Sequence, residues 1–138
     1  MILGIGSDLA KLDRISDVLD RHGQRFIDRC FTETEQKKAS RFKKNSEEWT
    51  ACYAKRWAAK EACAKALGVG IAQDVYLKDI GVENATTGSP SITLTGGAKK
   101  RLTEMTPSGM VIQIDLSLSD DPPYALAFVV ISAIASSD

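Results

Sequence analysis

The sequence has no excess of charge of either sign and few residues of the types that mark common sites. Its 138 residues include 18 Lys plus Arg and 18 Asp plus Glu, so the formal net charge is zero. Nucleic-acid-binding proteins usually carry a clear basic excess, so nucleic acid is not an expected partner. The chain has three cysteines, none at C-x-x-C spacing, which argues against a zinc or redox site of that type. We expect free thiols in a reducing compartment.

Long hydrophobic runs and targeting segments are also missing. The longest apolar run, Tyr124 to Ala135, is interrupted by Ser132 and is shorter than the roughly 20 residues that span a bilayer. The first ten residues show no basic segment ahead of an apolar one, so they do not read as a signal peptide. No internal repeat or linker stands out. These features predict a cytoplasmic protein with no membrane partner and a single domain over residues 1–138.

The first twenty residues predict a strand followed by a helix. Met1 to Ile5 is short and apolar, and the next three residues, Gly-Ser-Asp, resemble a break. Apolar residues then recur at helical spacing from Leu9 to Leu19. Asp8 is therefore expected where the strand ends and the helix begins, and its simplest structural role is that of a helix N-cap.

The rest of the chain predicts alternating helices and strands in a mixed order. Thr32 and Glu35 have the spacing of a capping box, and Ser46 is a natural N-cap for the longest helix, through Leu67. The other predicted elements are strands at 75–82 and 91–94, a helix capped by Thr95 that ends near Pro107 to Gly109, and strands at 112–118 and 124–134. We expect the last two strands to pair as an antiparallel hairpin. This order predicts an α+β fold with a mostly antiparallel sheet packed against helices.

The long helix carries the first candidate for chemistry. Glu61 and Lys65 are four residues apart and share a helix face, which also holds Trp57. The simplest interpretation is a surface ion pair worth about 0.3–0.5 kcal/mol. A functional interpretation combines Glu61 with Asp8, because Mg²⁺ prefers oxygen ligands and commonly uses one or two carboxylates with phosphate oxygens and waters. Lys65 would then neutralise a phosphate charge.

A set of short motifs decides between these interpretations, because together they resemble one family. The segments, in chain order, are GIGSDLAKLDRI (4–15), FTETE (31–35), KRWAAKEACAKALG (55–68), KDIGVEN (78–84), GSP (88–90) and LSLSDDPPYALAFVV (116–130). With these segments the chain is similar to holo-acyl-carrier-protein synthases, the small phosphopantetheinyl transferases of bacteria, and the resemblance runs to about Val130. The resemblance implies transfer of 4′-phosphopantetheine from coenzyme A to a serine of apo acyl carrier protein, in fatty acid biosynthesis. It also implies the fold of that family and a homotrimer with active sites at the subunit interfaces.

The resemblance also implies roles for particular residues. Asp8 and Glu61 match the family's magnesium ligands, and Lys65 matches a lysine that contacts the phosphates. The loop Gly88, Ser89 and Pro90 matches one that helps to hold the coenzyme A nucleotide. Ser117 and Ser119 fall in a late strand motif near the nucleotide or the interface. Arg14 and Arg21, seven residues apart on one helix face, resemble the basic surface that docks the acidic carrier protein; a solvated helix face is the alternative.

Two positions depart from the family pattern. Asp120 stands where the family often has histidine, and Ser89 stands where a larger or basic residue is common. An aspartate cannot donate to a phosphate as a protonated histidine does, so nucleotide contacts on that side are expected to differ.

Several alternatives stay open at this point. The base that accepts the serine proton is a metal-bound water, neutral Lys65 or a carboxylate such as Asp8. A metal-dependent diphosphate hydrolase would keep the same three residues and attack with water. A non-catalytic binding subunit would keep Glu61 and Lys65 as an ion pair only. His22, the one histidine, is expected to interact with the end of its helix rather than with substrate.

Overall fold

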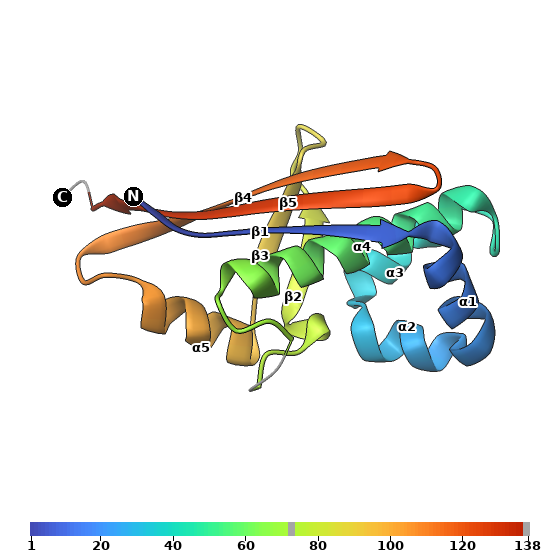
Figure 1. Ribbon diagram of the computed structural model, residues 1–138, viewed down its shortest axis with the longest axis horizontal. Coiled ribbons are helices and arrows are strands. Elements are labelled where there is room, and N and C mark those ends of the chain that lie inside the picture. The colour runs from blue at the N-terminus through green and yellow to red at the C-terminus, as the bar shows by residue number, and fades with distance from the viewer. Residues whose placement is uncertain (72–73, 137–138) are drawn as a thin grey trace.

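A three-stranded antiparallel sheet forms one layer of the protein, and helices pack on one of its faces (Figure 1). The computed structural model describes residues 1–71 and 74–136. The strands are β1 (Ile2–Lys11), β4 (Met110–Asp121) and β5 (Tyr124–Ala135), in the order β1–β5–β4. The predicted antiparallel hairpin of the last two strands is confirmed, with Met110 opposite Ala135 and Asp121 opposite Tyr124. The fold is α+β, as the order of elements predicted.

The long helix α4 (Glu47–Ala66) crosses the inner face of this sheet (Figure 1). Its N-cap is Ser46, whose side chain accepts a hydrogen bond from the backbone N–H of Trp49. The helix approaches β1 so closely that a Cβ on Gly6 would lie 1.9 Å from the carbonyl oxygen of Ala62. Glycine at this position therefore allows backbone-to-backbone packing of strand on helix.

The close packing corrects the prediction for Asp8. Strand β1 does not end at Ile5 but continues through Lys11, and Asp8 lies within it opposite Ala127 of β5. The Gly-Ser-Asp segment resembles a break only in isolation, because its ladder partners are more than a hundred residues away. Helix α1 (Leu12–His22) begins after Lys11, and Asp8 is not its N-cap.

Three short helices surround the N-terminal half of α4: α1, α2 (Gln24–Cys30) and α3 (Glu33–Ala39). The predicted capping box is confirmed, because Thr32 Oγ1 accepts from the Glu35 N–H and Glu35 Oε1 accepts from the Thr32 N–H. Buried apolar side chains of α1, α2 and α4 form a cluster here that includes Phe31 and Tyr53, whose ring centroids lie 4.7 Å apart. This end of the molecule thus consists of helices that pack together beside the sheet.

A second, two-stranded sheet of β2 (Ile80–Asn84) and β3 (Pro90–Leu94) runs across the long strands (Figure 1). Helix α5 (Gly96–Met105) follows it, close to the predicted position. The predicted strand at 75–82 is wrong in its first part, because Leu77–Asp79 form a short 3₁₀ helix, η1. The carbonyls of Leu77 and Ile80 both accept hydrogen bonds from Lys60 of α4, which ties the 3₁₀ helix and the start of β2 to α4.

Lys60 belongs to an ion pair that is completely buried. Its Nζ lies 2.8 Å from Oε1 of Glu35, and both side chains are 0% exposed. The second carboxylate oxygen of Glu35 accepts from the backbone N–H of Val82 at 2.7 Å. The pair therefore links α3, α4, η1 and β2, and every contact is a hydrogen bond to a charged group, the stronger kind.

The outer face of the three-stranded sheet is apolar and exposed. Residues that point away from α4 alternate along β1 and β5 with residues that point toward it. The exposed members on β1 and β5 include Ile5, Leu9, Tyr124, Leu126 and Phe128, with Leu9 directly opposite Leu126. A contiguous exposed apolar surface of this kind is typical of an assembly interface.

Candidate active site

Asp8, Glu61 and Lys65 converge between the middle of β1 and the C-terminal half of α4. Lys65 Nζ lies 3.3 Å from Oδ1 of Asp8 and donates a 2.9 Å hydrogen bond to the carbonyl of Ser7. Lys65 thus pairs with Asp8 across the strand–helix contact, and no Glu61–Lys65 ion pair occurs within the described residues. The surface ion pair expected from i, i+4 spacing is therefore replaced by a contact between two elements.

Glu61 is the electrostatically strained member of this cluster. Burial raises the pKa of its carboxyl above the usual value, the negative charge of Asp8 raises it further, and the ammonium of Lys65 lowers it. Asp8 and Glu61 are therefore near enough to repel each other. Two carboxylates held together with one shared lysine leave an excess of negative charge, which a cation can neutralise.

The donor set of this cluster fits a hard divalent cation. Asp8 and Glu61 offer carboxylate oxygens only, and Mg²⁺ typically binds one or two protein carboxylates and completes its coordination with phosphate oxygens and waters. No group of three or more Asp, Glu, His or Cys side chains gathers to hold a metal anywhere in the described ranges. A two-carboxylate site therefore leaves coordination positions for phosphate oxygens and waters.

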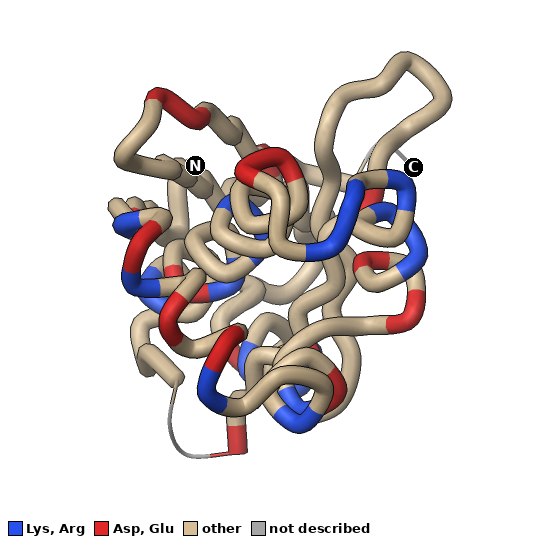
Figure 2. The backbone as a smooth tube through the Cα atoms, turned by 90° about the vertical axis from the view of Figure 1, so that its right-hand side faces the viewer, with Lys and Arg blue, Asp and Glu red and all other residues tan. Residues whose placement is uncertain are grey.

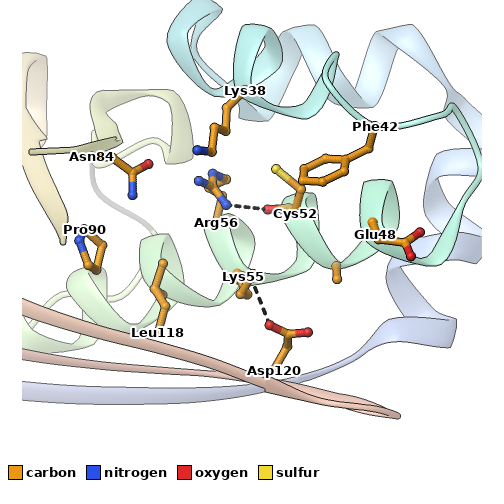
Figure 3. Close-up of a pocket in the computed structure, with 11 residues that line it drawn as sticks. Lys38, Phe42, Glu48, Cys52, Lys55, Arg56, Asn84, Pro90, Leu118 and Asp120 are labelled. Atoms are coloured by element: carbon orange, nitrogen blue, oxygen red, sulfur yellow. Dashed lines mark hydrogen bonds and ion pairs between the residues drawn. The ribbon is translucent and has the colours of Figure 1, made fainter. Parts of the chain in front are cut away.

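A cavity of about 370 Å³ opens elsewhere on α4, and we call it the anion pocket (Figure 3). Its lining brings together α3, α4, the β2–β3 sheet and the end of β4, and comprises Lys38, Phe42, Glu48, Ala51, Cys52, Lys55, Arg56, Asn84, Pro90, Leu118 and Asp120. Three of these residues are cations and two are carboxylates. The remainder includes an aromatic ring, a proline and a leucine, which together make a surface suited to a flat ring.

Arg56 is a buried cation in the lining of this pocket. The residue is only 5% exposed, and its Nη1 donates a 3.2 Å hydrogen bond to the carbonyl of Cys52. Its Nε has no hydrogen-bond partner in the described structure. A buried donor without a partner costs roughly 1–3 kcal/mol, and more when it is charged, so an anion in the pocket would relieve this deficit.

The predicted nucleotide-loop residues lie beside the anion pocket, not beside Asp8. Pro90 lines the pocket, and the preceding turn is held by a 3.0 Å bond from Asn84 Nδ2 to the carbonyl of Gly88. Ser89 is exposed and contacts Thr87. Gly88 has a φ of 89°, which favours glycine at this turn.

Ser117 belongs to neither cluster within one chain. It is exposed on β4, opposite Phe128, and Ser119 is exposed two residues further along. Both therefore lie on the outer, apolar face of the sheet, away from the face that packs on α4. Arg14 and Arg21 are exposed on α1.

Sequence reasoning missed Arg56 and Lys55 as members of a pocket, although both stand inside the motif KRWAAKEACAKALG. Arg56 and Glu61 are five residues apart, roughly 140° around the helix, so they point in different directions. The composition of the helix did not single out Arg56, because residues 47–66 contain seven charged residues.

Comparison with known proteins identifies one family. Residues 4–129 match the family model of the 4′-phosphopantetheinyl transferase superfamily. A holo-[acyl-carrier-protein] synthase of Rhodopseudomonas palustris (strain BisB5) is 59% identical over 134 residues, which cover 97% of this chain and 96% of that protein.

Solved structures are similar over nearly the whole chain. The crystal structure of holo-[acyl-carrier-protein] synthase from Neisseria meningitidis has a TM-score of 0.80 and 36% identity, and covers 96% of this chain and 99% of that one. The Bacillus anthracis synthase in complex with CoA (3′,5′-ADP) has a TM-score of 0.74 and 34% identity, and covers 95% and 96% of the two chains. With its carboxylate pair, its anion pocket and these matches, the chain belongs to the holo-acyl-carrier-protein synthase family of phosphopantetheinyl transferases.

Proposed function

We propose that this chain transfers the 4′-phosphopantetheine group of coenzyme A to a serine of an apo acyl carrier protein and releases adenosine 3′,5′-bisphosphate. The observation that carries the proposal is the convergence of Asp8, Glu61 and Lys65 at an open strand–helix contact. The proposal includes dependence on Mg²⁺, a role in fatty acid biosynthesis and a cytoplasmic location. Residues 1–138 would act as one domain.

The carboxylate pair and Lys65 have distinct roles in this proposal. Asp8 and Glu61 would hold Mg²⁺, which when bound neutralises charge on the diphosphate of coenzyme A. Lys65 is about half exposed and already close to Asp8, so its ammonium would contact a phosphate oxygen and offset the charge that develops in the transition state. The serine oxygen forms a bond to the phosphorus that bears pantetheine, and the bond from that phosphorus to the bridging oxygen breaks.

The anion pocket would hold the nucleotide end of coenzyme A. The unpartnered Nε of Arg56 and the nearby Lys38 provide donors for a phosphate, and Phe42, Pro90 and Leu118 provide apolar contacts for the adenine ring. The bound nucleotide would place the diphosphate for attack, which converts binding energy into orientation of the reacting group.

The separation of the two clusters supports assembly. Neither Asp8, Glu61 nor Lys65 lines the anion pocket, and Arg56 and Glu61 face different sides of α4. We therefore include in the proposal a homotrimer in which the carboxylate pair of one subunit meets the anion pocket of the next. The exposed apolar face of β1 and β5 is the surface that would be buried on assembly. Ser117 and Ser119 on that face would lie at the subunit interface.

The carrier protein would dock on α1. Arg14, Val18 and Arg21 recur at i, i+4 and i+7 and form one row on this helix. Asp13, Asp17 and Asp20 form an acidic row beside it, and Figure 2 shows Lys and Arg positions interspersed with Asp and Glu positions over this end of the molecule. An acidic partner would thus be guided by a narrow basic row, which affects orientation and association rate more than affinity.

Intact-mass spectrometry of an apo acyl carrier protein tests the proposal. We expect a mass gain of one phosphopantetheine after incubation with this protein, coenzyme A and Mg²⁺. The gain should be lost with EDTA and with Glu61→Ala, and it should persist with Glu104→Ala, a matched control on the exposed part of α5.

Two results would contradict the proposal. Cleavage of coenzyme A with no modified carrier would identify a hydrolase. No reaction with several carriers, and no effect of Glu61→Ala on Mg²⁺ binding, would identify a non-catalytic subunit.

A further inference from the structure

An ion pair joins two walls of the anion pocket. Lys55 on α4 and Asp120 at the end of β4 lie 3.0 Å apart, from Nζ to Oδ1, and their side chains are 28% and 34% exposed. Figure 3 shows the Asp120 carboxylate reaching up to α4 from the strand below, with the pair drawn as a dashed line. Both residues line the pocket, so the pair is positioned to contact whatever the pocket holds.

The other cations of the pocket have no such partner. Arg56 and Lys38 make no ion pair in the described residues, and the Nε of Arg56 makes no hydrogen bond. The pocket therefore contains two kinds of cation. Arg56 and Lys38 are available to an incoming anion, whereas the charge of Lys55 is already neutralised by Asp120.

We propose that Asp120 competes with the 3′-phosphate of the nucleotide for Lys55 and thereby sets how tightly the enzyme holds that phosphate. This inference rests on the proposed function, in which the pocket holds the nucleotide end of coenzyme A, the end that carries the 3′-phosphate. The phosphate must draw Lys55 away from Asp120 and tolerate the carboxylate nearby. The same carboxylate returns to Lys55 when adenosine 3′,5′-bisphosphate leaves, which favours release of this product.

The inference predicts opposite changes in nucleotide affinity when Asp120 and Lys55 are substituted. Asp120→Asn frees Lys55 and removes a negative charge, so binding of adenosine 3′,5′-bisphosphate tightens, by about 2–5-fold for a partly exposed pair. Lys55→Met removes the cation and leaves Asp120 unpaired beside the phosphate, so binding weakens by about 5–10-fold. Adenosine 5′-monophosphate has no 3′-phosphate, so its affinity changes by less than about 2-fold in either variant.

Isothermal titration calorimetry with these two nucleotides tests the inference. The wild-type assembly is compared with Asp120→Asn, Lys55→Met and two matched controls, Asp121→Asn and Lys99→Met, which are exposed and do not line the pocket. Thermal unfolding of each variant shows that it is folded. The mass-spectrometric transfer assay is run on the wild type in parallel, so that loss of the proposed function is detected separately.

The outcomes separate clearly. Tighter binding by Asp120→Asn and weaker binding by Lys55→Met, both confined to the 3′-phosphorylated nucleotide, support the inference. Weaker binding by Asp120→Asn would show that the aspartate positions Lys55 for the phosphate and does not compete for it, which overturns the inference. Equal changes with both nucleotides, or none, in an assembly that transfers phosphopantetheine would overturn it as well.

Discussion

Lys60 and Glu61 are neighbours on α4, yet one lies in a closed ion pair and the other in an open site. Lys60 is 0% exposed, and its ammonium contacts Glu35 and the carbonyls of Leu77 and Ile80. Glu61 is partly exposed, forms no ion pair in the described residues and lies near a second carboxylate, Asp8. The Lys60 ammonium therefore has a counter-charge and hydrogen-bond acceptors, whereas the Glu61 carboxylate has no ion-pair partner in the described residues and lies near a like charge.

The difference shows how burial and partners separate a structural charge from a functional one. Removing a partner from a buried pair leaves an uncompensated charge in the core, so the pair contributes chiefly to stability. An unsatisfied carboxylate with a raised pKa at an open site is typical of a functional position. Three substitutions or conditions test this contrast.

The largest expected effect is on the closed pair. Lys60→Met preserves most of the side-chain volume but leaves the Glu35 carboxylate buried without its counter-charge, so the free energy of unfolding should fall by about 3–5 kcal/mol. Urea unfolding measures this change. Glu35→Gln combined with Lys60→Met should recover part of the loss. A loss below about 1 kcal/mol in the single variant would show that the pair contributes little.

The same substitution at the open site should affect activity instead. Lys65→Met removes a cation from the proposed phosphate contact, so the phosphopantetheine transfer rate should fall about 100-fold, equivalent to about 2.7 kcal/mol of transition-state stabilisation. The exposed Lys65–Asp8 pair contributes at most about 1 kcal/mol to stability, so urea unfolding should change little. A decrease in the free energy of unfolding as large as that of Lys60→Met, or an unchanged transfer rate, would contradict the contrast between the two sites.

The smallest expected effect concerns ionisable groups on the closed side of α4. Burial raises the pKa of Tyr53 from 10.0 to about 12. As pH rises from 10 to about 12, the unfolded chain loses this proton while the folded protein keeps it, so folding stability falls. Tyr53→Phe should remove about 1 kcal/mol of this alkaline loss, as measured by urea unfolding at several pH values. Identical pH dependence in the wild type and Tyr53→Phe would contradict the assignment.

Local sequence chemistry determined much of the helical structure. The capping box at Thr32 and Glu35 and the N-cap at Ser46 satisfy helix-terminal N–H groups through side chains three residues away, and both formed as predicted. Alternation in β4 and β5 and the short turn between them predicted their pairing, because both strands and the turn are contiguous. The short motifs also indicated the family.

The placement of the charged residues depended on contacts between distant segments. Glu35 was predicted as a capping residue, and its second role, pairing with Lys60 and bonding Val82, arises only when α3, α4 and β2 meet. The end of β1 was misplaced because its ladder partner is β5, near the other end of the chain.

What the sequence alone determined about this protein is its α+β class, most of its helix boundaries and the residue types of a carboxylate–lysine site, because these follow from short-range periodicity, capping and motif spacing. Only the tertiary structure decided which charges are buried and which are open. Burial, the pKa of Glu61 and the unpartnered Nε of Arg56 are set by the side chains and backbone that surround each group in space, and those neighbours come from elements far apart in the chain.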